Sequence, residues 1–228
     1  MSPKLAIIHT IARLVPLYEE LCQELMPTVA RFHIADESLL EMLLAAHALT
    51  PAIYQRFADD AVSAERAGAD VILLTCSSIS PCVDPARSMV AVPLLKIDEP
   101  MADRAVALGT RIGVVATADT TLKPTSDLVR ASARAAHKDV VVETVLCEGA
   151  HKLMLAGDMA RHDEIVLRYL RQAMERYDVI VLAQGSMARV AELIPAGERK
   201  APILSSPRLG MERTRDVIMA LPPRQAGD

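Results

Sequence analysis

Short apolar runs alternate with amphipathic stretches along almost the whole chain. The apolar runs indicate strands at Leu5–Ile8, Val71–Leu74, Ile112–Val115, Val140–Val145 and Val179–Leu182. Most of them are apolar on consecutive residues, which is typical of a parallel sheet with helices covering both faces. Between the strands, helical periodicity predicts helices at Ile11–Met26, Ile53–Ala67, Lys123–His137, Asp158–Tyr177 and Gly210–Leu221. The alternation predicts an α/β fold built on mostly parallel sheets.

The pattern also repeats within the chain. Asp70–Ser78 aligns without a gap with Asp178–Ser186, at an offset of 108 residues. Leu5–Thr10 aligns with Ile112–Thr117, at an offset of 107 residues. The repeat predicts two similar halves, and the link between them, Val92–Pro100, reads as a strand, a turn and the start of a helix.

Composition narrows the range of functions. Of the 228 residues, 51% are hydrophobic and 24% are charged, which is enough apolar material for a sizeable core. The 25 Lys and Arg are outnumbered by 29 Asp and Glu, and no basic run exceeds two residues, so we expect no nucleic-acid partner. Two Phe, four Tyr and no Trp leave little material for stacking against bases or sugars.

Apolar run lengths and cysteine usage indicate the compartment. No apolar run approaches the roughly 18 to 20 residues that cross a bilayer, and the N-terminal apolar stretch is too short for a signal peptide. Four cysteines are too few for a disulfide scaffold in this chain, and none has zinc-site spacing. We therefore expect a cytoplasmic protein with no membrane partner and no structural metal.

Small polar residues follow the predicted strands. In an open parallel sheet, ligands bind beyond the carboxyl ends of the strands. Those positions hold His9, Thr10, Thr75, Cys76, Ser77, Ser78, Thr117, Thr120, Thr121, Gln184, Gly185 and Ser186. Their hydroxyls and nearby backbone N–H groups suit a carboxylate, although the Ser and Thr residues would serve equally as ordinary helix caps.

Cys76 is the candidate for a reactive thiolate among these residues. It directly follows an apolar strand, where the N-terminus of a following helix would favour its thiolate form. The alternative is a small buried hydrophobic residue, which is the role we assign to Cys22, Cys82 and Cys147. His9 either pairs with the thiolate or is structural. No G-x-G or G-x-S-x-G motif occurs, so neither a nucleotide cofactor nor a serine-hydrolase triad is expected.

Three segments resemble the aspartate/glutamate racemase superfamily, which includes hydantoin racemase, maleate isomerase and arylmalonate decarboxylase. They are Leu73–Ser78, Arg111–Thr117 followed by Thr120 and Thr121, and Val179–Met187; the Val92–Pro100 link is also similar. The resemblance runs from Leu5 to about Pro207. It implies two lobes related by a pseudo-twofold axis, residues 1–97 with 203–228 and residues 98–202, and a site in the cleft between them.

The resemblance also implies a mechanism without cofactors. In the family, two cysteines, one from each lobe, face opposite sides of a carbon next to a carboxylate. One thiolate removes a proton and the other thiol supplies one. This chain has the first cysteine as Cys76, but Gln184 occupies the second position, and an amide cannot shuttle protons at neutral pH. Arylmalonate decarboxylase, in contrast, looks like a member of the family that has kept only the cysteine of the second lobe.

The leading interpretation is a cofactor-independent racemase or isomerase acting on a small acid or amino acid. Cys76 would be the thiolate and His9 the second proton carrier, while the other strand-end residues would hold the carboxylate and the developing charge. A decarboxylase of a malonate-type acid and a non-catalytic carboxylate-binding relative remain as alternatives.

Family resemblance further implies a homo-oligomer, a dimer or larger. The apolar segment Leu39–Leu44 reads as a core helix, with a cover over the cleft or a dimer contact as alternatives.

Overall fold

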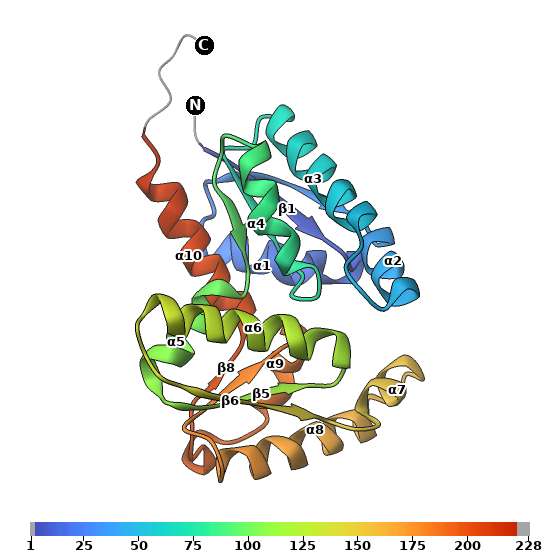
Figure 1. Ribbon diagram of the computed structural model, residues 1–228, viewed down its shortest axis with the longest axis vertical. Coiled ribbons are helices and arrows are strands. Elements are labelled where there is room, and N and C mark those ends of the chain that lie inside the picture. Colours follow the sequence, from blue (N-terminus) through green and yellow to red (C-terminus); the bar gives the residue numbers. More distant parts are fainter. Residues whose placement is uncertain (1–2, 223–228) are drawn as a thin grey trace. The chain divides into compact units, whose positions relative to one another are not determined.

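Parallel strands alternate with helices throughout residues 3–222, the part of the chain described by the computed structural model (Figure 1). The chain forms two compact units. Unit 1 runs up to Ile97 and resumes at Pro207, and unit 2 comprises Asp98–Ser206. Residues 203–206, which the sequence assigned to the first lobe, lie in unit 2 because strand β8 (Ile203–Leu204) pairs with a strand of that unit.

Unit 1 is built on a four-stranded parallel sheet with the order β2-β1-β3-β4. Its elements are β1 (Lys4–His9), α1 (Val15–Leu25), β2 (Ala30–Ala35), α2 (Ser38–Ala46), α3 (Pro51–Arg66), β3 (Val71–Leu74), α4 (Val83–Ala86), β4 (Leu94–Lys96) and α10 (Ser206–Ala220). Short 3-10 helices lie at Ala12–Leu14, Ser80–Cys82 and Arg87–Met89. Pro16 stands in the first turn of α1, and Pro51 in that of α3, a position where proline's missing N–H has no helical partner to lose.

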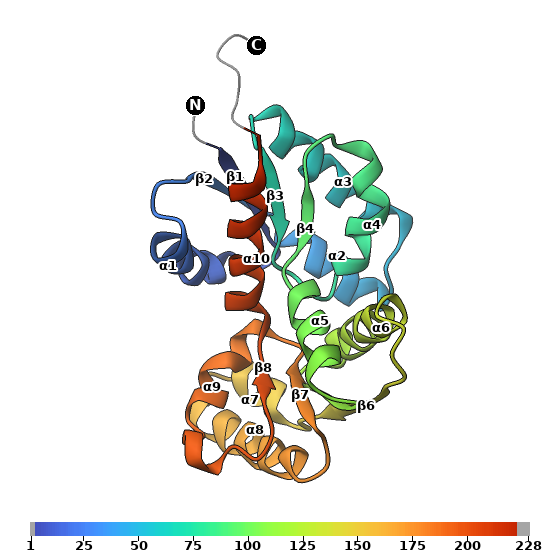
Figure 2. The same ribbon diagram turned by 90° about the vertical axis from the view of Figure 1, so that its left-hand side faces the viewer.

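Both faces of this sheet are buried. Alternate residues of a strand point to opposite faces, so Leu5 and Ile7 pack with residues of α1 and α10, whereas Ala6 and Ile8 pack with residues of α2, α3 and α4. Figure 2 shows these two sets of helices on opposite sides of the sheet. Leu39 and Leu43, one helical turn apart on α2, are both buried in the core, which confirms the interpretation of this segment as a core helix.

Unit 2 repeats this plan, with the strand order β6-β5-β7-β8. Its elements are α5 (Glu99–Leu108), β5 (Arg111–Ala116), α6 (Asp119–Ala135), β6 (Val141–Leu146), α7 (Ala150–Leu155), α8 (Met159–Met174), β7 (Val179–Leu182), α9 (Ala188–Glu192) and β8, with 3-10 helices at Gly185–Met187 and Ala196–Glu198. Helices α7, α8 and α9 pack with one another and with Val115, Ile180 and Leu182 on one face of the sheet.

The two sheets share their register as well as their order. Leu5 pairs with Val71 where β1 meets β3, and Ile112 pairs with Val179 where β5 meets β7. These are the residues that the internal repeat aligns. The predicted α/β fold, with two similar halves built on parallel sheets, is therefore confirmed. Strand β2 was not predicted, because its residues are only partly buried and do not form an apolar run.

Gly113 is the position in β5 where packing leaves no room for a side chain. A Cβ atom there would lie 2.3 Å from Cδ2 and 2.7 Å from Cε2 of Tyr177. The Tyr177 ring is buried, and its hydroxyl donates a 2.8 Å hydrogen bond to Glu143. The Tyr177 ring therefore lies directly on the backbone of β5 at Gly113, and its hydroxyl is fixed by Glu143.

We predict that Gly113→Ala destabilises the protein by about 1–3 kcal/mol, the usual cost of overpacking a well-packed core. Thermal unfolding followed by circular dichroism would measure this as a lower Tm. Gly197→Ala is the matched control, because a Cβ at Gly197 meets no atom within 4 Å. Equal melting temperatures for the two variants would contradict this account of the β5 packing.

Candidate active site

The candidate residues lie where the strand connections reverse direction. From β1 the chain passes to β2 on one side and then to β3 on the other, so the carboxyl ends of β1 and β3 form a topological switch point. Open α/β sheets bind ligands at such points. His9 and Thr10 lie at the end of β1, and Thr75 and Cys76 follow β3. In unit 2, Thr117 follows β5 and Gln184 follows β7 at the equivalent switch point.

His9 is fully buried, and both of its ring nitrogens are engaged within unit 1. Nδ1 lies 3.0 Å from the Thr75 hydroxyl oxygen, and Nε2 lies 2.9 Å from Nδ1 of His33. Burial, reinforced by the neighbouring His33, lowers the pKa of His9 to about 4, so the ring is neutral at pH 7. In this structure the imidazole bonds Thr75 and His33, and a role of His9 toward the Cys76 thiolate stays a prediction.

Strand geometry explains why His9 contacts Thr75 and not the adjacent residue, Cys76. Thr75 continues the face of β3 that packs on α1 and α10, whereas Cys76 packs with the core cluster on the face of α2, α3 and α4. Residues adjacent in an extended chain point to opposite faces. The thiol and the imidazole thus belong to the same strand-end edge but to opposite sides of the sheet.

Cys76 differs from the other three cysteines in exposure. It is partly exposed, whereas Cys22, Cys82 and Cys147 are buried, which confirms their interpretation as small hydrophobic residues. Burial raises the pKa of Cys22 to about 11, and the pKa of both Cys82 and Cys147 to about 12. These three thiols are therefore protonated and unreactive at neutral pH.

The segment after Cys76 differs from the expectation. A turn, a three-residue 3-10 helix with Pro81 in its first turn and the four-residue helix α4 follow the cysteine in place of a long helix. Such short helices have little macrodipole to favour a thiolate. Thr10, Ser77 and Ser78 are all buried near the strand ends of unit 1.

Gln184 is held in one orientation by unit 2. Its Oε1 accepts hydrogen bonds from the Thr117 backbone N–H at 2.7 Å, the Thr117 hydroxyl at 3.0 Å and the Ala118 N–H at 3.1 Å. With the carbonyl oxygen so occupied, the amide NH₂ is left as the group that can donate to a ligand. Within residues 3–222, no hydrogen bond from this NH₂ to another side chain or backbone group is formed.

The other predicted residues of unit 2 lie around the same strand ends. The Thr121 hydroxyl donates a 2.8 Å hydrogen bond to the Ala118 carbonyl in the first turn of α6, which is a local helix-start contact. Thr120 is partly buried beside it. Gly185 begins the 3-10 helix after β7, and Ser186 is exposed.

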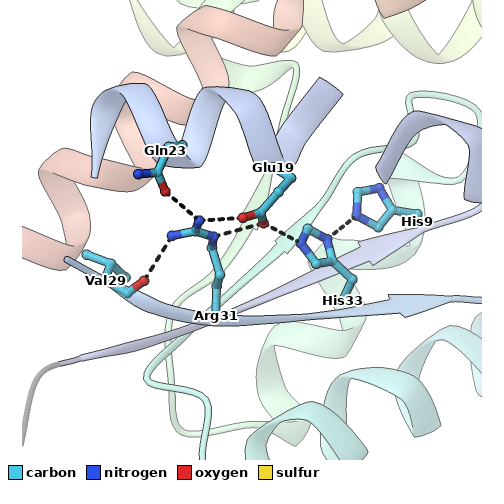
Figure 3. Close-up of polar contacts among 6 residues, drawn as sticks. All are labelled: His9, Glu19, Gln23, Val29, Arg31 and His33. Atoms are coloured by element: carbon cyan, nitrogen blue, oxygen red, sulfur yellow. Dashed lines mark hydrogen bonds and ion pairs between the residues drawn. The ribbon is translucent and has the colours of Figure 1, made fainter. Parts of the chain in front are cut away.

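Sequence reasoning missed three residues that extend the hydrogen-bond network of His9: His33, which contacts His9, and Glu19 and Arg31 beyond it. Figure 3 shows them in one network with His9. A signal was present in residues 30–35, where Ala30, Phe32 and Ile34 alternate with polar residues, as in a half-buried strand. Within the described residues, no group of three or more His, Cys, Asp or Glu side chains is arranged to hold a metal ion. Among helices of that same region, none is both long and apolar enough to cross a membrane.

Comparison with known proteins gives a consistent result. The family model described as Asp/Glu/Hydantoin racemase matches residues 9–214. Glutamate racemase from Bacillus anthracis has a TM-score of 0.70 at 14% identity, covering 95% of this chain and 82% of that one. Allantoin racemase from Klebsiella pneumoniae has a TM-score of 0.61 at 15% identity, covering 100% and 96%. Unliganded arylmalonate decarboxylase has a TM-score of 0.59 at 14% identity, covering 99% and 96%. At these identities the likeness shows a shared fold. No match was found among curated proteins.

We predict that Cys76 is the one rapidly alkylated cysteine of the native protein. The raised pKa values and burial of Cys22, Cys82 and Cys147 keep those thiols protonated and shielded. Mass spectrometry after a short iodoacetamide pulse should find a single modified site, which Cys76→Ser removes. Rapid labelling of any buried cysteine in the folded protein would contradict this assignment, and denaturant should expose all four.

We predict that Gln184→Leu destabilises the protein by about 1–3 kcal/mol, because the donors on Thr117 and Ala118 lose their acceptor. Urea unfolding would measure the loss. Gln184→Glu retains an oxygen acceptor at the same reach and should unfold close to the wild-type midpoint. A leucine variant as stable as the glutamate variant would show that the three hydrogen bonds do not hold this strand end together.

Proposed function

The chain belongs to the Asp/Glu/Hydantoin racemase family, and from this premise we propose a cofactor-independent racemase or isomerase. We propose that it acts at the carbon next to the carboxylate of a small acid or amino acid, with Cys76 as the thiolate. The carrying observation is the position and exposure of Cys76. Cys76 is partly exposed, whereas the other three cysteines are buried. It follows β3 at the switch point of its sheet.

The chemical problem defines what the remaining residues must do. A proton next to a carboxylate is far less acidic than a thiol, so the enediolate-like charge formed by its removal needs strong stabilisation. Each tenfold in rate corresponds to about 1.4 kcal/mol of barrier. Backbone N–H groups and hydroxyls at a dry strand-end edge supply such stabilisation. The proposed substrate-binding residues are Thr10, Thr75, Ser77, Ser78, Thr117, Thr120, Thr121, Gln184, Gly185 and Ser186.

Gln184 has a proposed role that differs from that of a second thiol. Three hydrogen bonds to its Oε1 orient the amide, so its N–H groups are the donors offered to a carboxylate or to an enediolate oxygen. An amide cannot give up a proton at neutral pH. A symmetric exchange between two thiols is therefore not part of the proposal.

Decarboxylation of a malonate-type acid is the second candidate. Loss of CO₂ leaves a carbanion that needs one proton, so a single thiol is sufficient. The observation in its favour is the presence of glutamine, rather than cysteine, at the second position. Arylmalonate decarboxylase shares the fold, as the racemases do.

A reducing compartment and self-association complete the proposal. We propose a cytoplasmic location, supported by four cysteines that are all free. We propose a homo-oligomeric state on the basis of the family alone.

We predict that Cys76→Ser lowers α-proton exchange by more than about 100-fold, since a positioned proton-transfer group contributes at least that much. The measurement is NMR-detected deuterium incorporation in D₂O for glutamate, aspartate, allantoin and 2-arylmalonates. Cys22→Ala is the control, because that cysteine is fully buried on α1. Retained exchange in Cys76→Ser would contradict the assignment. Release of CO₂ from an arylmalonate, with no α-proton exchange in the amino acids, would favour the decarboxylase.

A further inference from the structure

A chain of polar side chains leads from His9 through His33 to Glu19 (Figure 3). His9 Nε2 lies 2.9 Å from His33 Nδ1, and His33 Nε2 lies 3.2 Å from Oε2 of Glu19. At the inner end, His9 Nδ1 lies 3.0 Å from the hydroxyl of Thr75, the residue before Cys76. His9 is fully buried, whereas the side chains of His33 and Glu19 are 18% and 48% exposed. The chain is thus continuous from the buried strand end to water.

The fold places these groups on one face of the sheet. His33 pairs with Ile7 in the register of β1 and β2, so its side chain lies on the same face as His9, two residues further along β1. Helix α1 covers this face and supplies Glu19. The alignment follows from the strand register and from the position of α1.

The donors and acceptors along the chain can be assigned. Two hydrogen bonds from Arg31, one of them from Nε at 2.9 Å, fall on the Glu19 carboxylate. The hydrogen bond from Arg31 is the main cause that lowers the pKa of Glu19 to about 2, so Glu19 is ionised and only accepts. His33 must then donate from Nε2, and in the arrangement with a single proton on its ring it accepts at Nδ1. His9 donates from Nε2, which leaves its Nδ1 as an acceptor facing Thr75.

A second arrangement of the same atoms holds one more proton. When a proton reaches His9 Nδ1, the ring passes its Nε2 proton to Nδ1 of His33. His33 becomes an imidazolium that donates to both His9 and Glu19, and His9 is neutral again. The Thr75 hydroxyl, 3.2 Å from the Ile8 carbonyl oxygen, then donates there and accepts from His9 Nδ1. In the reverse sequence, His9 Nδ1 gives its proton to the Thr75 oxygen while the Thr75 hydroxyl gives its own proton to the substrate carbanion, so the stored proton ends on the substrate carbon and Thr75 is again a hydroxyl.

The charge in this second state belongs on His33 and not on His9. The groups facing the two rings are His9 and His33 themselves, Thr75 after β3, and Glu19 and the Tyr18 ring from α1, and Arg31 from β2 bonds the Glu19 carboxylate. Burial disfavours a charged His9, whereas the carboxylate of Glu19 faces His33 directly. Arg31 shares this carboxylate, so the arrangement with one proton on each ring has no net charge over Glu19, Arg31, His9 and His33.

We propose that the His9–His33–Glu19 chain is a proton store that returns a proton to the strand-end edge beside Cys76, through the Thr75 hydroxyl. It would take the place of the thiol that is missing at Gln184. Unit 2 has no equivalent chain, since the internal repeat places Ala116 and Ala183 where unit 1 has His9 and Thr75. The catalytic role of this proton store rests on the proposed function, whereas the positions of its protons can be tested independently.

The first test needs no substrate. Long-range ¹H–¹⁵N NMR of the histidine rings in the full-length protein reports which nitrogen carries the proton. At neutral pH, His9 and His33 should each carry it on Nε2. Glu19→Ala should convert both rings to mixed tautomers, whereas the neighbouring control Glu20→Ala should leave them fixed. A proton on Nδ1 of His9 in the wild-type protein, or equal spectra for the two variants, would overturn the proposal.

The second test measures proton return. With whichever of glutamate, aspartate, allantoin or an arylmalonate shows Cys76-dependent turnover, His33→Ala should lower turnover by about 100-fold, the lower range for a positioned proton-transfer group. KM and the rate of Cys76 alkylation should stay within about twofold, and added imidazole should restore turnover, because His33 is partly open to solvent. Unchanged turnover, or a loss that imidazole does not restore, would overturn the proposal.

Failure of the two proposals can be told apart. If no probe acid turns over in the wild-type protein, the proposed function fails, and the tautomer measurement still decides the assignment of the proton store. If turnover depends on Cys76 but not on His33, the proposed function stands and the proton store does not.

Discussion

Burial of the two central strands of each sheet, complete in β3 and β7 and complete after the first residue in β1 and β5, is the constraint on which the candidate site depends. Every residue of β3 and β7 is buried, and helices cover both faces of each strand. An unpartnered polar side chain in such a strand would have to give up its water without compensation. Polar chemistry is therefore confined to the carboxyl ends, where the chain leaves the sheet. The strand order brings two of these ends together in each unit. The position of the candidate site therefore follows from the topology of the sheets and not from particular side chains.

His9 is a polar residue that lies within the sheet itself, at the last position of β1. As the last residue of β1 it is fully buried, and it is tolerated because both ring nitrogens find partners across the two neighbouring strands, His33 on β2 and Thr75 after β3. Unit 2 has the same backbone at this point but alanines at the corresponding positions, and its polar contacts converge on Gln184 instead. One scaffold thus holds a titratable network in one unit and a neutral amide network in the other.

Much of this could be predicted from the sequence, and the exceptions have physical causes. The apolar runs and the internal repeat located β1, β3, β5 and β7 because fully buried strands have a continuous hydrophobic signal. Strand β2 was not predicted, because it is half exposed and because Arg31 and His33 interrupt its apolar residues. Cys76 was found from its place after β3. Glu19 could not be found, because its relation to His33 depends on how α1 packs on the sheet, and no local pattern encodes that packing.

The asymmetry between Cys76 and Gln184 bears on where positive charge is available for an anionic substrate. In the proposed reaction a carboxylate beside a thiolate would create like charges, and neither Gln184 nor the nearby hydroxyls could offset them with a full charge. With one proton on each ring, the set of Glu19, Arg31, His9 and His33 has no net charge, and uptake of one more proton gives it a charge of +1. A bound anion at the Thr75 end therefore favours the protonated form of the set through space. By thermodynamic linkage, binding of the anion and loading of the proton strengthen each other. In this way a unit with a single thiol would acquire its second proton at the time when the substrate is present.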